Sequence, residues 1–326
     1  MGSDDEYCGE ILLMEKKYCF GVDIGGTTTK MGLFTIDGEL VEKWEIPTRT
    51  VPKGEPVLPD VADAIQKKMS ERDIAFEEVV GIGYGAPVSM TADGYVTWSA
   101  NIGWEEMNVS KKLAELTGMK VIGGNDVNVA GMGEYWRGAA QGYKNVVMIT
   151  IGTGVGAAII ADGKVIVGAT GGAGEVGHIH VNDDCKLQCG CGGYGCLEQY
   201  GSATAVVRLA KELLEKDERP SVMRGQEMTA KVVFDAVKEG DALAIEVAEQ
   251  FGDAIGKGLA AVVAVVEPEA FIVGGGVSKA GDVVLDYIKK YYQKYAYPAA
   301  PKKEFLLASL GNDAGIYGGA YRVLFE

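Results

Sequence analysis

Histidine and long hydrophobic runs are both scarce in this chain. Only two of its 326 residues are histidine, and the longest aliphatic run covers residues 259–266. That run is far shorter than the roughly 20 residues a membrane helix needs. Positive charge is also low, because 31 Lys and Arg stand against 46 Asp and Glu and give a formal net charge of −15. Neither nucleic acid nor an anionic membrane is attracted to such a surface, so we expect neither as a partner.

A secretory signal is absent from the first residues, which are acidic and lack a basic start and an apolar core. The chain has six cysteines, and four of them fall between Cys185 and Cys196. This clustering is typical of a metal site in a reduced protein. We therefore expect a cytoplasmic protein. An anionic substrate such as ATP agrees with the charge, because backbone N–H groups and a metal ion bind it locally.

Glycine is abundant, at 47 residues, and marks an internal repeat. The order strand, glycine turn, strand, Asx-Gly turn, strand occurs over 18–46 and again over 145–167. Helical periodicity fills much of the remaining chain, and residues 1–17 form a polar, flexible leader. Two copies of one pattern predict two similar α/β domains that face each other across a cleft.

The first glycine turn is a candidate phosphate loop. Asp23 lies near the end of an apolar strand, just before the turn that contains Gly25, Gly26, Thr27 and Thr28. Backbone N–H groups in such a turn surround a phosphate, although a plain glycine hairpin is an equal alternative. A buried, unpaired carboxylate is costly unless it meets a cation. This cost favours a hydrated Mg²⁺ ion near Asp23.

Two further glycine segments are candidates for the same chemistry. Gly152-Thr153-Gly154 is the second copy of the turn, and we expect it to hold phosphate. A dinucleotide fingerprint does not fit there, because Ala157 replaces the last glycine and a strand follows in place of a helix. Gly274-Gly275-Gly276 leads from a strand toward a helix, where a nucleotide's ribose or α-phosphate can lie against the backbone.

The strongest local pattern is a set of metal ligands. Cys189, Cys191, Cys196 and His178 supply three thiols and one imidazole, which suit a closed, tetrahedral and structural zinc site better than unliganded thiols. Closing the chain onto one ion brings Glu175 and Glu198 near each other. Each alone is more often a solvated surface acid. Held as a pair, they are suited to accept hydrogen bonds from sugar hydroxyls.

Asp126 is the candidate general base. It follows an apolar strand and begins a helix, together with Asn125. Helix capping is the simpler interpretation, because Asp is among the best N-cap residues. A helix N-terminus also keeps a carboxylate ionised, which is the state that a general base requires.

With these residues identified, the chain resembles the ROK family of bacterial sugar kinases, and within it the glucokinases. The zinc motif is highly specific, whereas the glycine loops are not. The matching motifs are DIGGT at 23–27, GAP at 85–87, ND at 125–126, GTG at 152–154, ExGH at 175–178, CGCGxxGCxE at 189–198, GGG at 274–276 and LGNDAG at 310–315.

The resemblance implies a two-domain, actin-like ATPase fold of the ribonuclease-H type, with duplicated mixed β-sheets flanked by helices. It implies a small domain of residues 18–124 plus 312–326, and a large domain of residues 125–311 with the zinc loop. A hexose and ATP are the implied substrates, with Mg²⁺ and structural zinc, in a homodimer or homotetramer. Asp126 matches the family's base, and the implied sugar-site residues are Ala86, Pro87, Asn125, Asp126, Glu175, His178 and Glu198.

The chain also departs from the family pattern. Many members carry Lys directly after DIGGT, where this chain has Thr28 and places Lys30 two positions later. The sugar loop reads Ala86-Pro87-Val88, where Pro-Gly-Pro is frequent.

Two of the rival functions come from the same family. One is a kinase for N-acetylmannosamine, N-acetylglucosamine, fructose or allose, although Asn101-Ile102-Gly103-Trp104 resembles the NLGW of glucokinases and favours glucose. Another is a sugar-sensing repressor, which the acidic charge and the short leader disfavour. A non-catalytic actin-like scaffold would not need the zinc loop.

Overall fold

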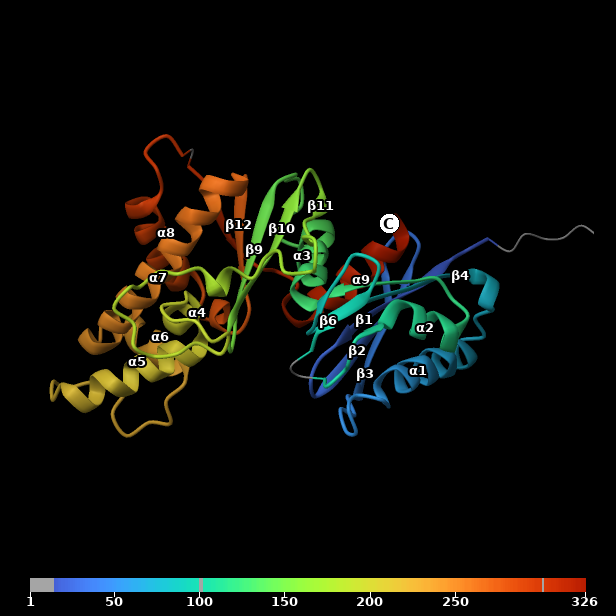
Figure 1. The fold of residues 1–326 in the computed structure, drawn as a ribbon, viewed down its shortest axis with the longest axis horizontal. Helices are drawn as coiled ribbons and strands as arrows, with labels where there is room; N and C mark the ends of the chain where they lie inside the picture. The colour runs from blue at the N-terminus through green and yellow to red at the C-terminus, as the bar shows by residue number, and fades with distance from the viewer. Residues whose placement is uncertain (1–14, 100–101, 301) are drawn as a thin grey trace, which may run out of the picture.

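The computed structural model describes residues 15–99, 102–300 and 302–326. Within them the chain forms two lobes, each built on a five-stranded mixed sheet (Figure 1). We call these the first and the second lobe in chain order. Residues 1–14 of the expected leader and Asn101 of the glucokinase-like stretch lie outside the described residues. No helix in the described part is long and apolar enough to cross a membrane.

The first sheet contains β1 (Tyr18–Ile24), β2 (Thr28–Thr35), β3 (Leu40–Pro47), β4 (Val79–Ala86) and β8 (Val121–Asn125). Its strand order is β3-β2-β1-β4-β8, with β1 antiparallel to β2 and parallel to β4. A small sheet lies beside it, made of β5 (Ser89–Met90), β6 (Tyr95–Trp98) and β7 (Met107–Asn108).

The second sheet contains β9 (Val146–Ile151), β10 (Val155–Ala161), β11 (Lys164–Val165), β12 (Ala270–Gly274) and β13 (Glu304–Leu307). Its order, β11-β10-β9-β12-β13, and its strand directions repeat those of the first sheet. The predicted duplication is therefore confirmed. The strand predicted over 164–167 is shorter than expected and ends at Val165.

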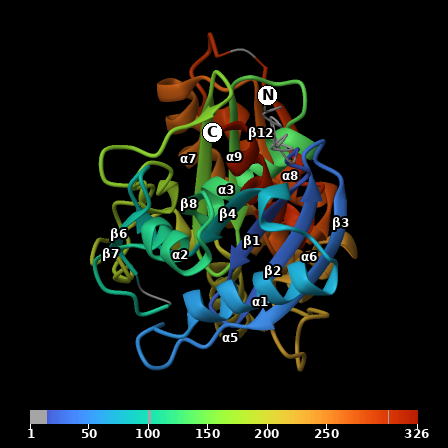
Figure 2. The same cartoon turned by 90° about the vertical axis from the view of Figure 1, so that its right-hand side faces the viewer.

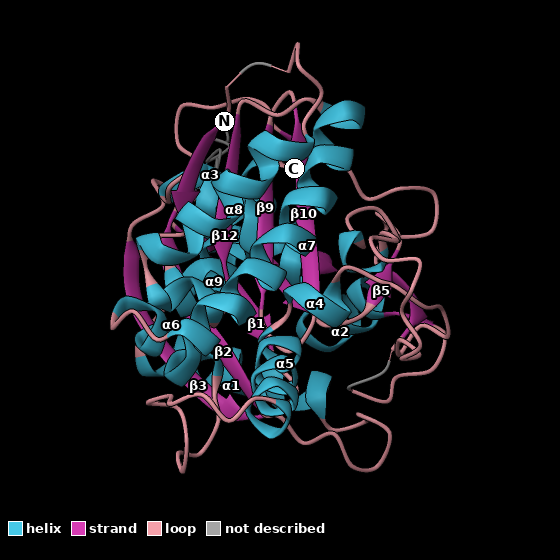
Figure 3. Ribbon diagram, turned by 90° about the vertical axis from the view of Figure 1, so that its left-hand side faces the viewer, coloured by secondary structure: helices cyan, strands magenta, loops and turns pink. Residues whose placement is uncertain are grey.

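Helices cover both faces of each sheet, which explains why the central strands are almost wholly apolar. On the second sheet, Val147 and Ile149 of β9 pack into the outer core, while Val146 and Met148 pack into the inner one. The outer helices of this lobe are seen in Figure 3 and are α4 (Glu198–Gly201), α5 (Ala203–Lys216), α6 (Ala230–Lys238), α7 (Ala242–Val266) and α8 (Asp282–Tyr295).

The first sheet is covered on its outer face by α1 (Val57–Glu71) and α2 (Val109–Thr117) (Figure 2). Between the two sheets lie α3 (Asp126–Arg137), which packs on β10, and α9 (Ala314–Phe325), which packs on β1 and β4. The two helices also pack on each other. The final helix thus returns to the first sheet, as the resemblance implied, while the exact domain limits stay a prediction.

Candidate functional site

A cleft of about 370 Å³ lies between the two lobes and collects residues from both. The first lobe and the start of α3 contribute Pro87, Asn125 and Asp126. The second lobe contributes Gly152, Gly154, Glu175, Glu198 and Gly275. The structure therefore brings together residues that lie far apart in the sequence and that we selected as sugar or phosphate ligands.

Asn125, not Asp126, is the cap of α3. The Oδ1 atom of Asn125 accepts hydrogen bonds from the backbone N–H groups of Val127 and Asn128, at 2.9 and 3.2 Å. The capping role considered for Asp126 is therefore wrong, because the helix begins at Asp126 itself. One oxygen of Asp126 accepts from Val127 N at 2.9 Å.

Burial raises the pKa of Asp126 to about 6. The hydrogen bond from Val127 N lowers this pKa, as expected at a helix N-terminus, but burial has the larger effect. The carboxylates of Asp23 and Glu175 raise it further. A carboxyl group with such a pKa is mostly ionised at neutral pH and still takes up a proton readily, which suits a general base.

Asp23 is paired, contrary to the expectation of an unpaired acid. It lies opposite Lys30 in the register of β1 and β2, and Lys30 Nζ lies 3.8 Å from Asp23 Oδ2. Burial raises the pKa of Asp23, and Lys30 opposes this shift. Lys30 Nζ also donates to the carbonyl oxygen of Asn312 at 3.3 Å. The lysine that follows the glycine turn therefore already contacts the candidate Mg²⁺ carboxylate.

In each of the two glycine turns, one backbone N–H group donates a hydrogen bond within the turn itself. Gly25 N donates to Thr28 O at 3.1 Å, and Gly152 N donates to Gly154 O at 3.0 Å. The N–H group of the first glycine in each turn is therefore not available to a phosphate. The cleft wall, as far as the structure describes it, does not include the other residues predicted for sugar, phosphate or Mg²⁺, namely Asp23, Gly25, Gly26, Thr27, Thr28, Ala86, Thr153, His178, Gly274 and Gly276.

Gly275 needs to be glycine where β12 ends. Its φ of +83° lies in the left-handed region, and a Cβ there would lie 2.5 Å from Ile151 O. The absence of a side chain lets the end of β12 lie against the end of β9. Two of the three candidate phosphate segments, around Gly152 and Gly275, therefore lie side by side at the carboxyl ends of β9 and β12.

The four predicted zinc ligands form one cluster. The ligand atoms of His178, Cys189, Cys191 and Cys196 all lie within 4.8 Å of one another. Cys191 Sγ is 3.7 Å from Cys196 Sγ, and Cys189 Sγ is 3.7 Å from His178 Nδ1. Two sulfurs bound to a tetrahedral zinc at about 2.3 Å lie about 3.8 Å apart. The donor set and its spacing therefore fit a closed zinc site.

His178 lies between the two cleft carboxylates. Its Nδ1 atom faces the cysteines and is 3.7 Å from Glu198 Oε1, while its Nε2 atom is 4.0 Å from Glu175 Oε2. Cys189 Sγ donates to Glu198 Oε1 at 3.0 Å. The zinc cluster and the cleft therefore share a boundary made of these side chains.

The other histidine and the fourth clustered cysteine lie outside the ligand group. His180 bonds Tyr194 O at 2.8 Å and Asp183 Oδ1 at 2.9 Å, so it fastens the loop. Cys185 Sγ donates to Leu187 O at 3.4 Å.

Sequence reasoning missed part of the cleft wall, including Thr150 and the Ala173-Gly174 pair. Gly174 O accepts a hydrogen bond from Ala157 N at 2.8 Å, which fastens the segment before Glu175 onto β10. The glycine-rich run at 168–174 was the available signal for this contact. No sequence signal pointed to Thr150, because it is a single polar residue inside an apolar strand.

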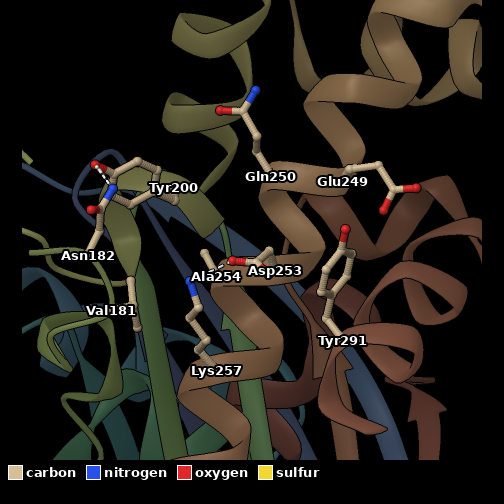
Figure 4. Close-up of a pocket in the computed structure, with 9 residues that line it drawn as sticks. All are labelled: Val181, Asn182, Tyr200, Glu249, Gln250, Asp253, Ala254, Lys257 and Tyr291. Carbon is tan, nitrogen blue, oxygen red and sulfur yellow. Dashed lines mark hydrogen bonds and ion pairs between the residues drawn. The ribbon is translucent and has the colours of Figure 1, made fainter. Parts of the chain in front are cut away.

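A second cavity, of about 290 Å³, lies beside α7, and Val181, Asn182 and Tyr200 also line it (Figure 4). Its acids are already paired, since Glu249 bonds Lys290 at 2.6 Å and Asp253 lies 2.7 Å from Lys257. None of the predicted catalytic or substrate residues lines it. We therefore place the chemistry in the cleft between the lobes.

Comparison with known proteins identifies the family. The ROK family profile matches residues 19–325. This chain belongs to the ROK family. A glucokinase from Halalkalibacterium halodurans is 41% identical over 316 residues, which cover 95% of this chain and 96% of that protein. The family resemblance and the predicted fold class are thereby confirmed.

Other ROK proteins show the range of the family. The structure of a Streptomyces griseus ROK glucokinase in complex with glucose and AMPPNP has a TM-score of 0.76 and 33% identity, over 94% of this ROK protein and 98% of that chain. A xylose repressor from Caldicellulosiruptor bescii is 27% identical over 283 residues, which cover 86% of this chain and 71% of the repressor.

Proposed function

We propose that this ROK protein transfers the γ-phosphoryl group of ATP to the primary hydroxyl of glucose. The observation that carries the proposal is the cleft between the lobes, which Asp126, Glu175 and Glu198 line together. The glucokinases among its relatives support glucose as the sugar, and the Streptomyces griseus complex with glucose and AMPPNP supports ATP as the donor. The repressor relative is less similar, at 27% identity.

Asp126 is the proposed general base. Phosphoryl transfer has a loose transition state, so the protein acts mainly by positioning and by neutralising charge. Asp126 aligns the sugar hydroxyl and accepts its proton. Glu175, His178 and Glu198 accept or exchange hydrogen bonds with ring hydroxyls. Pro87 lines the opposite wall, and Ala86 is buried directly before it. Asn125 caps the start of α3 through its Oδ1 atom, and its Nδ2 atom donates a hydrogen bond to Val88 O at 3.3 Å.

The proposed nucleotide site consists of the glycine segments 25–28, 152–154 and 274–276. Asp23 would hold Mg²⁺ through water, and the ion would supply charge neutralisation on the phosphates. Lys30 contacts Asp23, so it either shares that carboxylate or turns to a phosphate. Closure of the two lobes would exclude water from the transfer.

The proposed zinc ligands are His178, Cys189, Cys191 and Cys196. The metal's role is structural, because four protein ligands leave no open position. Zinc ligation removes the thiol proton of Cys189, and with it the hydrogen bond that Glu198 accepts. Glu198 Oε1 would then be free for a sugar hydroxyl. The cytoplasmic location and the homodimer or homotetramer stay predictions.

We expect glucose to have a higher kcat/KM than 2-deoxyglucose, mannose and N-acetylated hexosamines. An analogue that lacks a hydroxyl leaves a buried acceptor unpaired, at a cost of about 1 to 3 kcal/mol. N-acetylated sugars also require space for an acetamide. A coupled assay with ATP and Mg²⁺ across this panel, with fructose and allose included, tests the proposal.

The same panel of sugars tests the choice of glucose separately from the kinase activity. A higher kcat/KM for N-acetylmannosamine or fructose than for glucose would contradict the choice of sugar and leave the kinase activity standing. No phosphorylation of any sugar would overturn both.

A further inference from the structure

Glu134 is a fully buried acid in the last turns of α3, with 0% exposure. Its carboxylate accepts four hydrogen bonds, all from neutral donors. The donors are Ala139 N at 2.8 Å, Ser309 N at 3.1 Å, Ser309 Oγ at 3.2 Å and Leu310 N at 2.8 Å. Among the described residues, no Lys or Arg forms an ion pair with it. Backbone dipoles therefore hold this carboxylate.

These four bonds join the two chain segments that lead from the second sheet to the helices between the sheets. Ala139 lies in the segment from α3 to β9, and Ser309 and Leu310 lie in the segment from β13 to α9. One carboxylate thus fastens both connections at the same point. Rotation of the second sheet relative to α3 and α9 has to bend the chain near it.

The helices that carry these connections pack unusually closely. A Cβ at Gly318 would lie 1.7 Å from Val129 O, and a Cβ at Gly133 would lie 2.2 Å from Ala314 O. Direct backbone contact leaves no compressible side chains between α3 and α9, so the pair transmits movement as one unit. At its other end, Arg322 Nη1 donates to Gly123 O, close before Asn125 and Asp126.

We propose that Glu134 is a positioning residue for the reaction, acting as the pivot that sets the second lobe against Asp126. The glycine segments at the ends of β9 and β12 belong to the second sheet, whereas Asp126 begins α3, whose backbone contacts that of α9 directly. Glu134 fixes the angle between these two bodies and keeps phosphate and base in reach of each other when the cleft closes. The inference rests on the proposed kinase function.

Glu134→Gln tests it. The amide keeps the side-chain shape. Its NH₂ group, however, does not accept hydrogen bonds from N–H donors, so the bonds to one of the two side-chain oxygens are lost. We expect kcat to fall between about tenfold and a hundredfold, because a small misplacement of reacting groups costs that much. The Kd of glucose, measured by calorimetry without nucleotide, should change less than about twofold. Small-angle scattering should show a smaller contraction on adding glucose and AMPPNP than in the wild type.

Asp241→Asn is the matched control. Asp241 also accepts hydrogen bonds from several backbone N–H groups, those of Leu243, Ala244 and Val222, but it caps α7 in the outer layer of the second lobe. We expect this variant to lose stability while its kcat per folded molecule stays at the wild-type value. A merely structural role for Glu134 predicts the same result for both variants, and that outcome would overturn the proposal.

Further outcomes keep the inference separate from the proposed function. If Glu134→Gln does not fold, Ser309→Ala decides, since it removes one bond and should lower kcat by about fivefold. An unchanged kcat there counts against the pivot. If the wild type phosphorylates no sugar, the kinase proposal fails and the pivot falls with it, whereas an active wild type with a fully active Glu134→Gln overturns the pivot alone.

Discussion

Asp126→Asn should leave the chain folded and lower kcat for glucose phosphorylation by about 10²-fold or more. The amide retains the shape and the hydrogen bond from Val127 N, but it does not accept a proton from the sugar hydroxyl. Asn125 caps α3 independently, so the helix should keep its N-terminus. Initial rates at saturating glucose and ATP measure the effect, with Asp241→Asn as the control. A variant with near wild-type kcat would show that Asp126 is not the base.

The pH dependence of catalysis provides a second test of Asp126 as the base. Burial raises the pKa of Asp126 to about 6, so the free protein loses the ionised base as the pH falls through that value. The logarithm of kcat/KM for glucose should therefore be flat above about pH 7 and fall with unit slope below about pH 6. Bound Mg²⁺ brings positive charge near the carboxylates and lowers such a pKa. The profile of kcat should accordingly break at a lower pH than that of kcat/KM.

Much of the fold was predictable because its signals are local. The glycine turns and Asx-Gly turns mark the ends of apolar strands, and the duplication of this pattern made the two sheets visible in the sequence. The helical periodicity expected between the strands corresponds to helices with an apolar face, such as α5. The zinc cluster was predictable for the same reason, since its four ligands lie close together in the chain.

Features that depend on strand register or long-range packing were not predictable. The Asp23–Lys30 contact exists because an antiparallel turn places these residues opposite each other, and a shift of one residue would separate them. Glu134 reads in the sequence as an ordinary polar residue on a helix. Glu134 becomes buried only when Ser309 and Leu310, which precede α9, fold over the end of α3. These two residues lie more than half of the chain length away from Glu134 in the sequence.

The zinc site leads to the other large expected effect. Protein prepared without added zinc should contain one zinc per chain by metal analysis. In Cys191→Ser the hydroxyl is a poor zinc ligand, and a structural zinc site contributes folding free energy directly. Cys191 is exposed and contacts Cys196 Sγ at 3.7 Å, so the substitution removes a ligand without opening a cavity in the core.

Losing the metal should free the loop that holds His178 between Glu175 and Glu198, and so damage the sugar side of the cleft. We expect kcat/KM for glucose to fall by about a hundredfold in Cys191→Ser, the upper end of the loss that follows disruption around metal sites. The Kd of AMPPNP should change less than about threefold, because the glycine segments lie on other loops. Cys185→Ser is the matched control, since Cys185 lies in the same loop outside the ligand cluster and bonds Leu187 O. A zinc content near zero in the wild type, or equal losses for glucose and nucleotide, would contradict a zinc loop that serves the sugar site.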